Sequence, residues 1–114
     1  MIKSMSDRSP YQLIKSLEGD LTSVLSMVDV YALDARVVKI VTLLQKQIID
    51  ARLDVRDYEL SETREEQVKS AINSQRRIEA VRKDILAASE YNIFSPVDVA
   101  QLTAQLELVT EKLE

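Results

Sequence analysis

Three aspartates, Asp50, Asp54 and Asp57, follow one another at spacings of four and three residues. On a helix this spacing places them along one side, because residues at these intervals lie about one turn apart. Carboxylate oxygens are ligands that Mg²⁺ prefers, so the chemistry they could support is metal binding. Arg52 and Arg56 are interleaved with them, however, and alternating charge is typical of a solvated helix face. We interpret the aspartates as such a face, and an acidic Mg²⁺-dependent enzyme is the weaker alternative.

Other catalytic chemistry is limited by the residue types that the chain lacks. It contains no histidine and no cysteine, and Gly19 is its single glycine. The commonest general base, the thiol nucleophile and the usual zinc ligands are therefore missing. One glycine also excludes the glycine-rich loops that bind phosphates and dinucleotides. We predict a protein without catalytic residues, metal or cofactor.

A row of cations is the most suggestive pattern in the chain. Lys69, Arg76 and Lys83 recur every seven residues, and at 100° per residue they stay within about 40° of one another on a helix. Arg77 and Arg82 flank this row. We predict that these five cations form a partner-binding surface.

The charge balance narrows the kind of partner. Residues 64–83 carry six positive and three negative groups, whereas residues 84–114 carry one and six. The whole chain has a formal net charge of −4, and nucleic-acid-binding proteins usually show a stronger basic footprint. A protein partner is therefore favoured over nucleic acid, which we keep as an alternative. The simplest competing interpretation is a solvated helix face, balanced in part by Glu79 and Asp84.

Five consecutive polar residues, Asn73 to Arg77, form a full turn without an apolar side chain. Such a turn could be a buried polar layer that sets the register of a bundle, at some loss of stability. Alternatively, it marks where the helix projects beyond its neighbours, and we favour this interpretation. A projecting helix would present Arg76 and Arg77 for docking.

Several apolar residues lie off the faces that we assign to the core, and four of these six belong to the second predicted helix. They are Val38, Leu43, Ile49, Leu53, Val97 and Leu108. Single exposed apolar residues are ordinary, but this group leaves room for a second interface. Self-association is the simplest explanation, because symmetric homodimers are the commonest oligomers. We predict a homodimer interface that includes Val38, Ile49 and Leu53.

The apolar spacing predicts an all-α protein, folded as an antiparallel up-down-up-down four-helix bundle. The predicted helices span about residues 10–28, 35–58, 64–90 and 96–113. Ser9-Pro10 and Ser95-Pro96 mark two helix starts, because serine caps free N–H groups and proline fits the first helical position. Residues 59–63 contain neither glycine nor proline, so a turn there competes with one continuous helix. We favour the turn.

The composition agrees with this fold class. A chain of 114 residues that is 46% hydrophobic suffices for one domain with an apolar core. One glycine and two prolines are too few for a turn-rich β fold. We expect a disordered or extended arm over residues 1–9 and a single helical domain over residues 10–114.

The overall expectation is a non-catalytic helical interaction protein, such as an adaptor, a chaperone-like protein or a regulatory subunit. A polar N-terminal stretch and the lack of a long apolar run predict a cytoplasmic protein without membrane contact. The alternative is a small nucleic-acid-binding regulator that uses the cations of the third helix.

Overall fold

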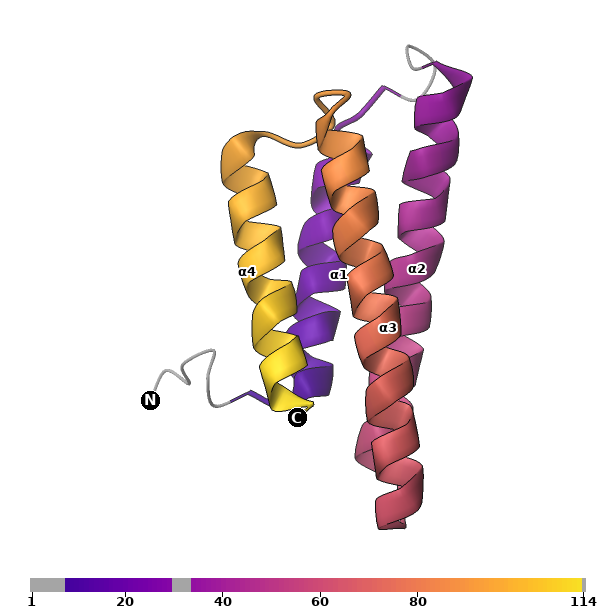
Figure 1. The fold of residues 1–114 in the computed structure, drawn as a ribbon. Coiled ribbons are helices and arrows are strands. Elements are labelled where there is room, and N and C mark those ends of the chain that lie inside the picture. The colour runs from indigo at the N-terminus through magenta and orange to yellow at the C-terminus, as the bar shows by residue number, and fades with distance from the viewer. Residues whose placement is uncertain (1–7, 30–33, 114) are drawn as a thin grey trace.

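Four helices account for most of the chain in the computed structural model, which describes residues 8–29 and 34–113. They are α1 (Pro10–Ser26), α2 (Ala35–Leu60), α3 (Arg64–Ser89) and α4 (Pro96–Lys112). Successive helices run in opposite directions, and each packs against two others: α1 against α2 and α4, and α3 against α2 and α4 (Figure 1). The predicted antiparallel four-helix bundle is confirmed.

The interior is aliphatic, as the three-four spacing of the sequence predicts. Leu17 and Leu21 of α1, Leu44 of α2, Ile85 of α3 and Leu106 of α4 are at most 1% exposed. Burial of large aliphatic side chains is the main force that holds such helices together.

Side-chain caps fix where all four helices begin, at Ser9, Asp34, Thr63 and Ser95. Ser9 accepts a hydrogen bond from the Gln12 N–H at 3.2 Å, and Gln12 Oε1 accepts one from the Ser9 N–H at 3.0 Å. This is a complete capping box. Ser95 accepts from the Asp98 N–H at 3.1 Å, and the shorter Asp98 side chain does not complete the box. The two Ser-Pro starts are therefore confirmed.

The chain turns between α2 and α3, so the predicted break at residues 59–63 is also confirmed. Thr63 Oγ1 accepts from the Glu66 N–H at 3.1 Å, and Glu66 Oε2 accepts from the Glu62 N–H at 3.2 Å. At the end of α2, the Ser61 hydroxyl donates to the Asp57 carbonyl at 2.7 Å. These contacts satisfy polar groups at both helix ends, which allows a tight connection without glycine or proline.

Just after the C-terminal end of α3, one residue has backbone dihedral angles in the left-handed region. Asn92 has φ 62°, a conformation that asparagine tolerates better than most residues. Its N–H donates to the Ser89 carbonyl at 3.0 Å, and the Ile93 N–H donates to the Ala88 carbonyl at 3.3 Å. This Schellman-type arrangement turns the chain toward α4.

The helices differ in length, and the α2–α3 hairpin is longer than the rest of the bundle. α2 and α3 have 26 residues each, whereas α1 and α4 have 17. At 1.5 Å per residue the difference is roughly 13 Å. The end of the hairpin that carries the α2–α3 turn extends beyond α1 and α4 (Figure 1).

Two helix ends differ by two residues from the sequence-based bounds. α1 ends at Ser26, because the N–H groups of Met27 and Val28 bond back to Val24 and Leu25 in tighter turns. α2 continues to Leu60, and Ser61 takes the capping position.

The predicted N-terminal arm lies mostly outside the described residues, since the structure describes the chain from Arg8 and Ser9 already caps α1. Within the described ranges, no helix combines the length and apolar character needed to cross a membrane.

Candidate partner-binding surface

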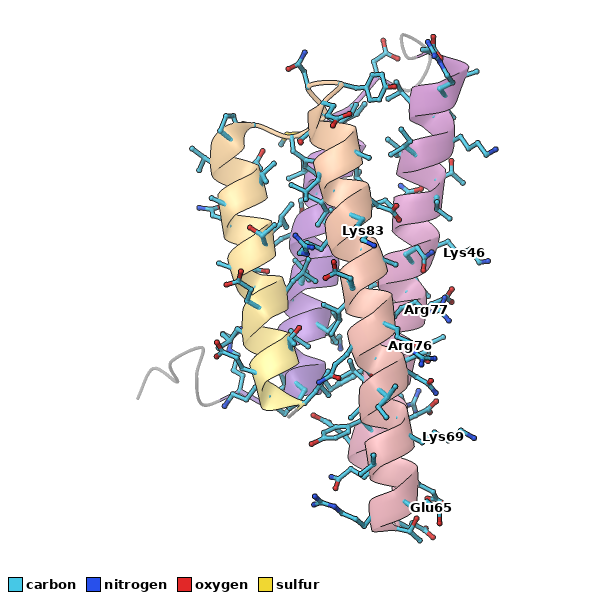
Figure 2. All side chains as sticks on the ribbon, viewed as in Figure 1. Lys46, Glu65, Lys69, Arg76, Arg77 and Lys83 are labelled. Atoms are coloured by element: carbon cyan, nitrogen blue, oxygen red, sulfur yellow. The ribbon has the colours of Figure 1, made fainter. Side chains whose placement is uncertain are left out.

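The five predicted cations of α3 point in three different directions. Lys69, Arg76 and Lys83 form an outward row, defined here by these three residues, and all three are exposed. Figure 2 shows Lys69 extending away from the bundle. Among the residues that the structure describes, no carboxylate lies within 4.0 Å of any of the three. All three side chains are therefore exposed cations without an ion pair in the described part of the chain.

Arg77 instead lies on the side of α3 that faces α2. Its Nε is 3.3 Å from Asp54 Oδ2, and its Nη1 is 3.7 Å from Asp50 Oδ2. The same Nη1 donates to Gln47 Oε1 at 3.3 Å. Two carboxylates of α2 thus compensate this guanidinium, which links the two long helices.

Arg82 lies on the opposite side of α3, toward α4. It donates to Glu79 through Nε at 3.0 Å and through Nη2 at 2.5 Å. These hydrogen bonds, followed by the Glu79 charge, raise the pKa of Arg82, and the charge of Glu107 on α4 adds to the effect. The pKa of Glu79 is lowered mainly by its hydrogen bonds to Arg82, and the nearby Lys83 charge contributes. Arg82 therefore also has a compensated charge.

Two of the three predicted aspartates of α2 contact Arg77. Asp50 and Asp54 lie beside Arg77, whereas Asp57 is exposed. Within residues 8–29 and 34–113, no group of three or more acidic, histidine or cysteine side chains is placed to hold a metal ion.

An open groove of about 400 Å³ runs along the α2–α3 contact beside the outward row. Its lining combines the Arg77 cluster with exposed Asn73 and Arg76 and half-buried Ala80. The groove is therefore lined both by the ion-paired Arg77 and Asp54 and by Arg76, which has no ion pair within the described residues.

Ser74 is the buried member of the polar turn over residues 73–77. It is fully buried, and its hydroxyl has no hydrogen-bond partner among the described residues. Asn73 and Arg76 are exposed, so the turn is not a continuous buried layer. Leu113, just after α4, shares a groove with Ala71 and Ile72 of α3. The end of α4 is therefore level with Ala71 and Ile72 of α3. The part of α3 that projects beyond α4 comes before these residues in the sequence, and the polar turn comes after them.

Asp84 is a feature of α3 that sequence reasoning treated only as a balancing charge. It is half-buried, and its Oδ2 has no hydrogen-bond partner within the described part of the chain. Burial raises the pKa of Asp84. Its burial depends on neighbouring helices, which the local sequence does not reveal.

The predicted dimer interface on α2 is partly accessible. Ile49 is 43% exposed and Leu53 is 44% exposed, whereas Val38 is half-buried. Leu60 is 65% exposed, which is more than Ile49 or Leu53. The sequence-based helix ends at residue 58, so Leu60 is not part of the predicted interface. Ile49 also lines a groove of about 250 Å³ between α1 and α2.

The other apolar residues assigned off the core separate into different places. Leu43 is exposed on another side of α2, and Val97 is exposed at the start of α4. Leu108 packs partly against the core. These three do not extend the α2 surface.

Comparison with known proteins adds no relative to this description. The sequence significantly matches no protein-family description, no curated protein and no solved structure. The bundle and its surfaces are therefore the basis for any functional proposal.

Proposed function

We propose that this chain is a non-catalytic helical interaction protein, acting as an adaptor, a chaperone-like protein or a regulatory subunit in the cytoplasm. Its main contact would be the outward row of α3, which binds an acidic segment of a protein partner. Arg77 and Arg82 lie at the edges of this contact and mainly hold neighbouring groups in place.

The observation that supports this proposal is that no ion pair within 4.0 Å engages the row in the described part of the chain, although Glu79 lies near enough to Lys83 to interact with its charge. Lys69, Arg76 and Lys83 repeat at intervals of about 10.5 Å along the helix, given a rise of 1.5 Å per residue. No ion pair within the described chain involves them, although Arg77 beside them has two. A helix that carries carboxylates every seven residues would match this spacing, and charge complementarity would steer its approach.

The proposal includes a homodimer formed through α2, with Ile49 and Leu53 in the contact and Val38 near its edge. Exposed apolar side chains on one face of α2 support it. The outward row belongs to α3, so both contacts can exist in one molecule.

The test for the partner contact is site-specific photo-cross-linking in the native cell, with the cross-linker in place of exposed Asn73. The captured protein is then purified, and its affinity is measured by calorimetry. We expect Arg76→Glu to weaken binding at least about fivefold, because it turns an attraction into a repulsion. Lys15→Glu, at an exposed position of α1, makes the same charge change and should alter the affinity less than twofold.

Equal affinities for the Arg76→Glu and Lys15→Glu variants would contradict the proposed contact. Titration with duplex DNA tests the nucleic-acid alternative. Binding that falls steeply with salt would favour it. In that case Arg76→Ala should weaken DNA binding more than Arg77→Ala, because Asp50 and Asp54 already compensate Arg77.

A further inference from the structure

The outward face of α2 carries a stripe of three exposed aliphatic residues. Ile49, Leu53 and Leu60, which we call the α2 stripe, are separated by four and seven residues and lie within about 40° on the helix. They are 43%, 44% and 65% exposed. Spacings of four and seven resemble the seam by which one helix packs along another.

Opposite charges lie along one edge of this stripe. Lys46 and Asp57 are eleven residues apart, so they fall three turns apart and within about 20° of each other. Both are exposed, and neither takes part in an ion pair within the described residues. Figure 2 shows Lys46 extending away from the neighbouring helices.

This arrangement is complementary to itself in one orientation. A two-fold axis between Ala51 and Arg52 pairs two antiparallel copies of α2. It places Lys46 opposite Asp57 of the second copy, and Ile49 within one residue of Leu53. The symmetry generates each contact twice, so the pair has two salt bridges along one edge and an apolar seam beside them.

The neighbouring groove provides a third match. Ile49 lines this groove with Gln45 of α2 and Leu21, Thr22 and Leu25 of α1. In the antiparallel register, Leu60 of the second copy comes opposite residue 43, two residues before Gln45 at the edge of the groove. The most exposed member of the stripe thus lies next to the groove.

We infer that α2 pairs with α2 of a second copy in this antiparallel register, with Lys46 and Asp57 determining the orientation. This inference makes specific the homodimer part of the proposed function. It is independent of the contact between the outward row of α3 and a protein partner.

Charge exchange tests the register. The dimer dissociation constant is measured by sedimentation for the natural chain, Lys46→Glu, Asp57→Lys and the double variant. Each single change replaces two attractions by two repulsions, and we expect about tenfold weaker association. The double variant restores opposite charges and should return to within about twofold of the natural chain. Lys69→Glu, a control on α3, should leave the constant unchanged.

A second test uses the lack of native cysteine. Under mild oxidation, a mixture of Ile49→Cys and Leu53→Cys should form disulfide-linked heterodimers faster than either variant alone forms homodimers. Two cysteines can join only at short Cβ separations. Leu43→Cys is the matched control, because Leu43 is also 43% exposed but lies about 120° around the helix from Ile49.

The outcomes separate the inference from the proposals on which it rests. A monomer up to millimolar concentration would refute both the homodimer and its register, and would leave the partner contact of α3 standing. A dimer that single charge reversals do not weaken, or that the double variant does not restore, would refute the register alone. Faster homodimer cross-linking by Ile49→Cys alone would place residue 49 opposite itself, as in a parallel pair or an antiparallel pair centred on Ile49, and would also overturn the register.

Discussion

At the scale of single residues, the polar side chains that α3 buries set the clearest expectations. Ser74 is fully buried without a partner for its hydroxyl, and Asp84 has a half-buried carboxylate with one unpartnered oxygen. Desolvation without a compensating hydrogen bond is unfavourable for both groups.

Replacement of Ser74 by alanine should stabilise the fold by about 1 kcal/mol, because it removes an unsatisfied buried hydroxyl and raises helix propensity. Urea denaturation at neutral pH measures the change. Ser70→Ala, at a half-buried position one turn away, provides the control and should gain only the propensity part. A clear loss of stability in Ser74→Ala would show that the hydroxyl has a favourable role.

Asp84→Asn should increase the free energy of unfolding at pH 7. Burial raises the pKa of Asp84 in the folded state, so folding favours its protonated form. As pH rises from the unfolded-state pKa to the folded-state pKa, the carboxylate therefore lowers stability, and the penalty is complete above that interval. The gain from Asp84→Asn should shrink as pH falls through the same interval. Denaturation curves from pH 3 to pH 8 measure it, and a gain independent of pH would contradict the explanation.

At the scale of elements, α3 carries one cation that contacts α2 and other cations that are exposed. Its Arg77 joins α3 to Asp50 and Asp54 of α2, whereas Arg76, the preceding residue, faces outward. A step of about 100° around the helix separates these neighbours in space.

Arg77→Ala should therefore destabilise the protein by about 1 kcal/mol, since it leaves Asp50 and Asp54 as neighbouring like charges without a cation. Partial exposure of the cluster keeps the effect modest and sensitive to salt. Thermal denaturation at low and high salt provides the measurement. Arg76→Ala should lie within about 0.5 kcal/mol of the natural chain, and equal losses would contradict the distinction.

The helices themselves were predictable from local signals. Ser9-Pro10 and Ser95-Pro96 mark two starts, and Thr63 with Glu66 marks a third, because caps depend on residues close in sequence. The end of α2 was less predictable. Ser61 closes it through its own hydroxyl, and Leu60 belongs to the helix for that reason.

At the scale of the whole molecule, the number of helices and their antiparallel order follow from the apolar spacing and short connections. The candidate surface was only partly predictable. The five cations lie on one helix, as predicted, but which of them are compensated depends on α2 and α4, whose positions around α3 cannot be read from the sequence. The burial of Asp84 and Ser74 was not predicted for the same reason.

The contact of Arg77 with Asp54 has a consequence for how this sequence can diverge. Relatives that keep the bundle should change positions 54 and 77 together, because either charge without the other weakens the α2–α3 packing. Position 76 has no ion-pair partner within the described chain that would constrain it in this way. Position 76 should instead covary with residues of the binding partner. Substitutions at the adjacent positions 76 and 77 should therefore be uncorrelated with each other.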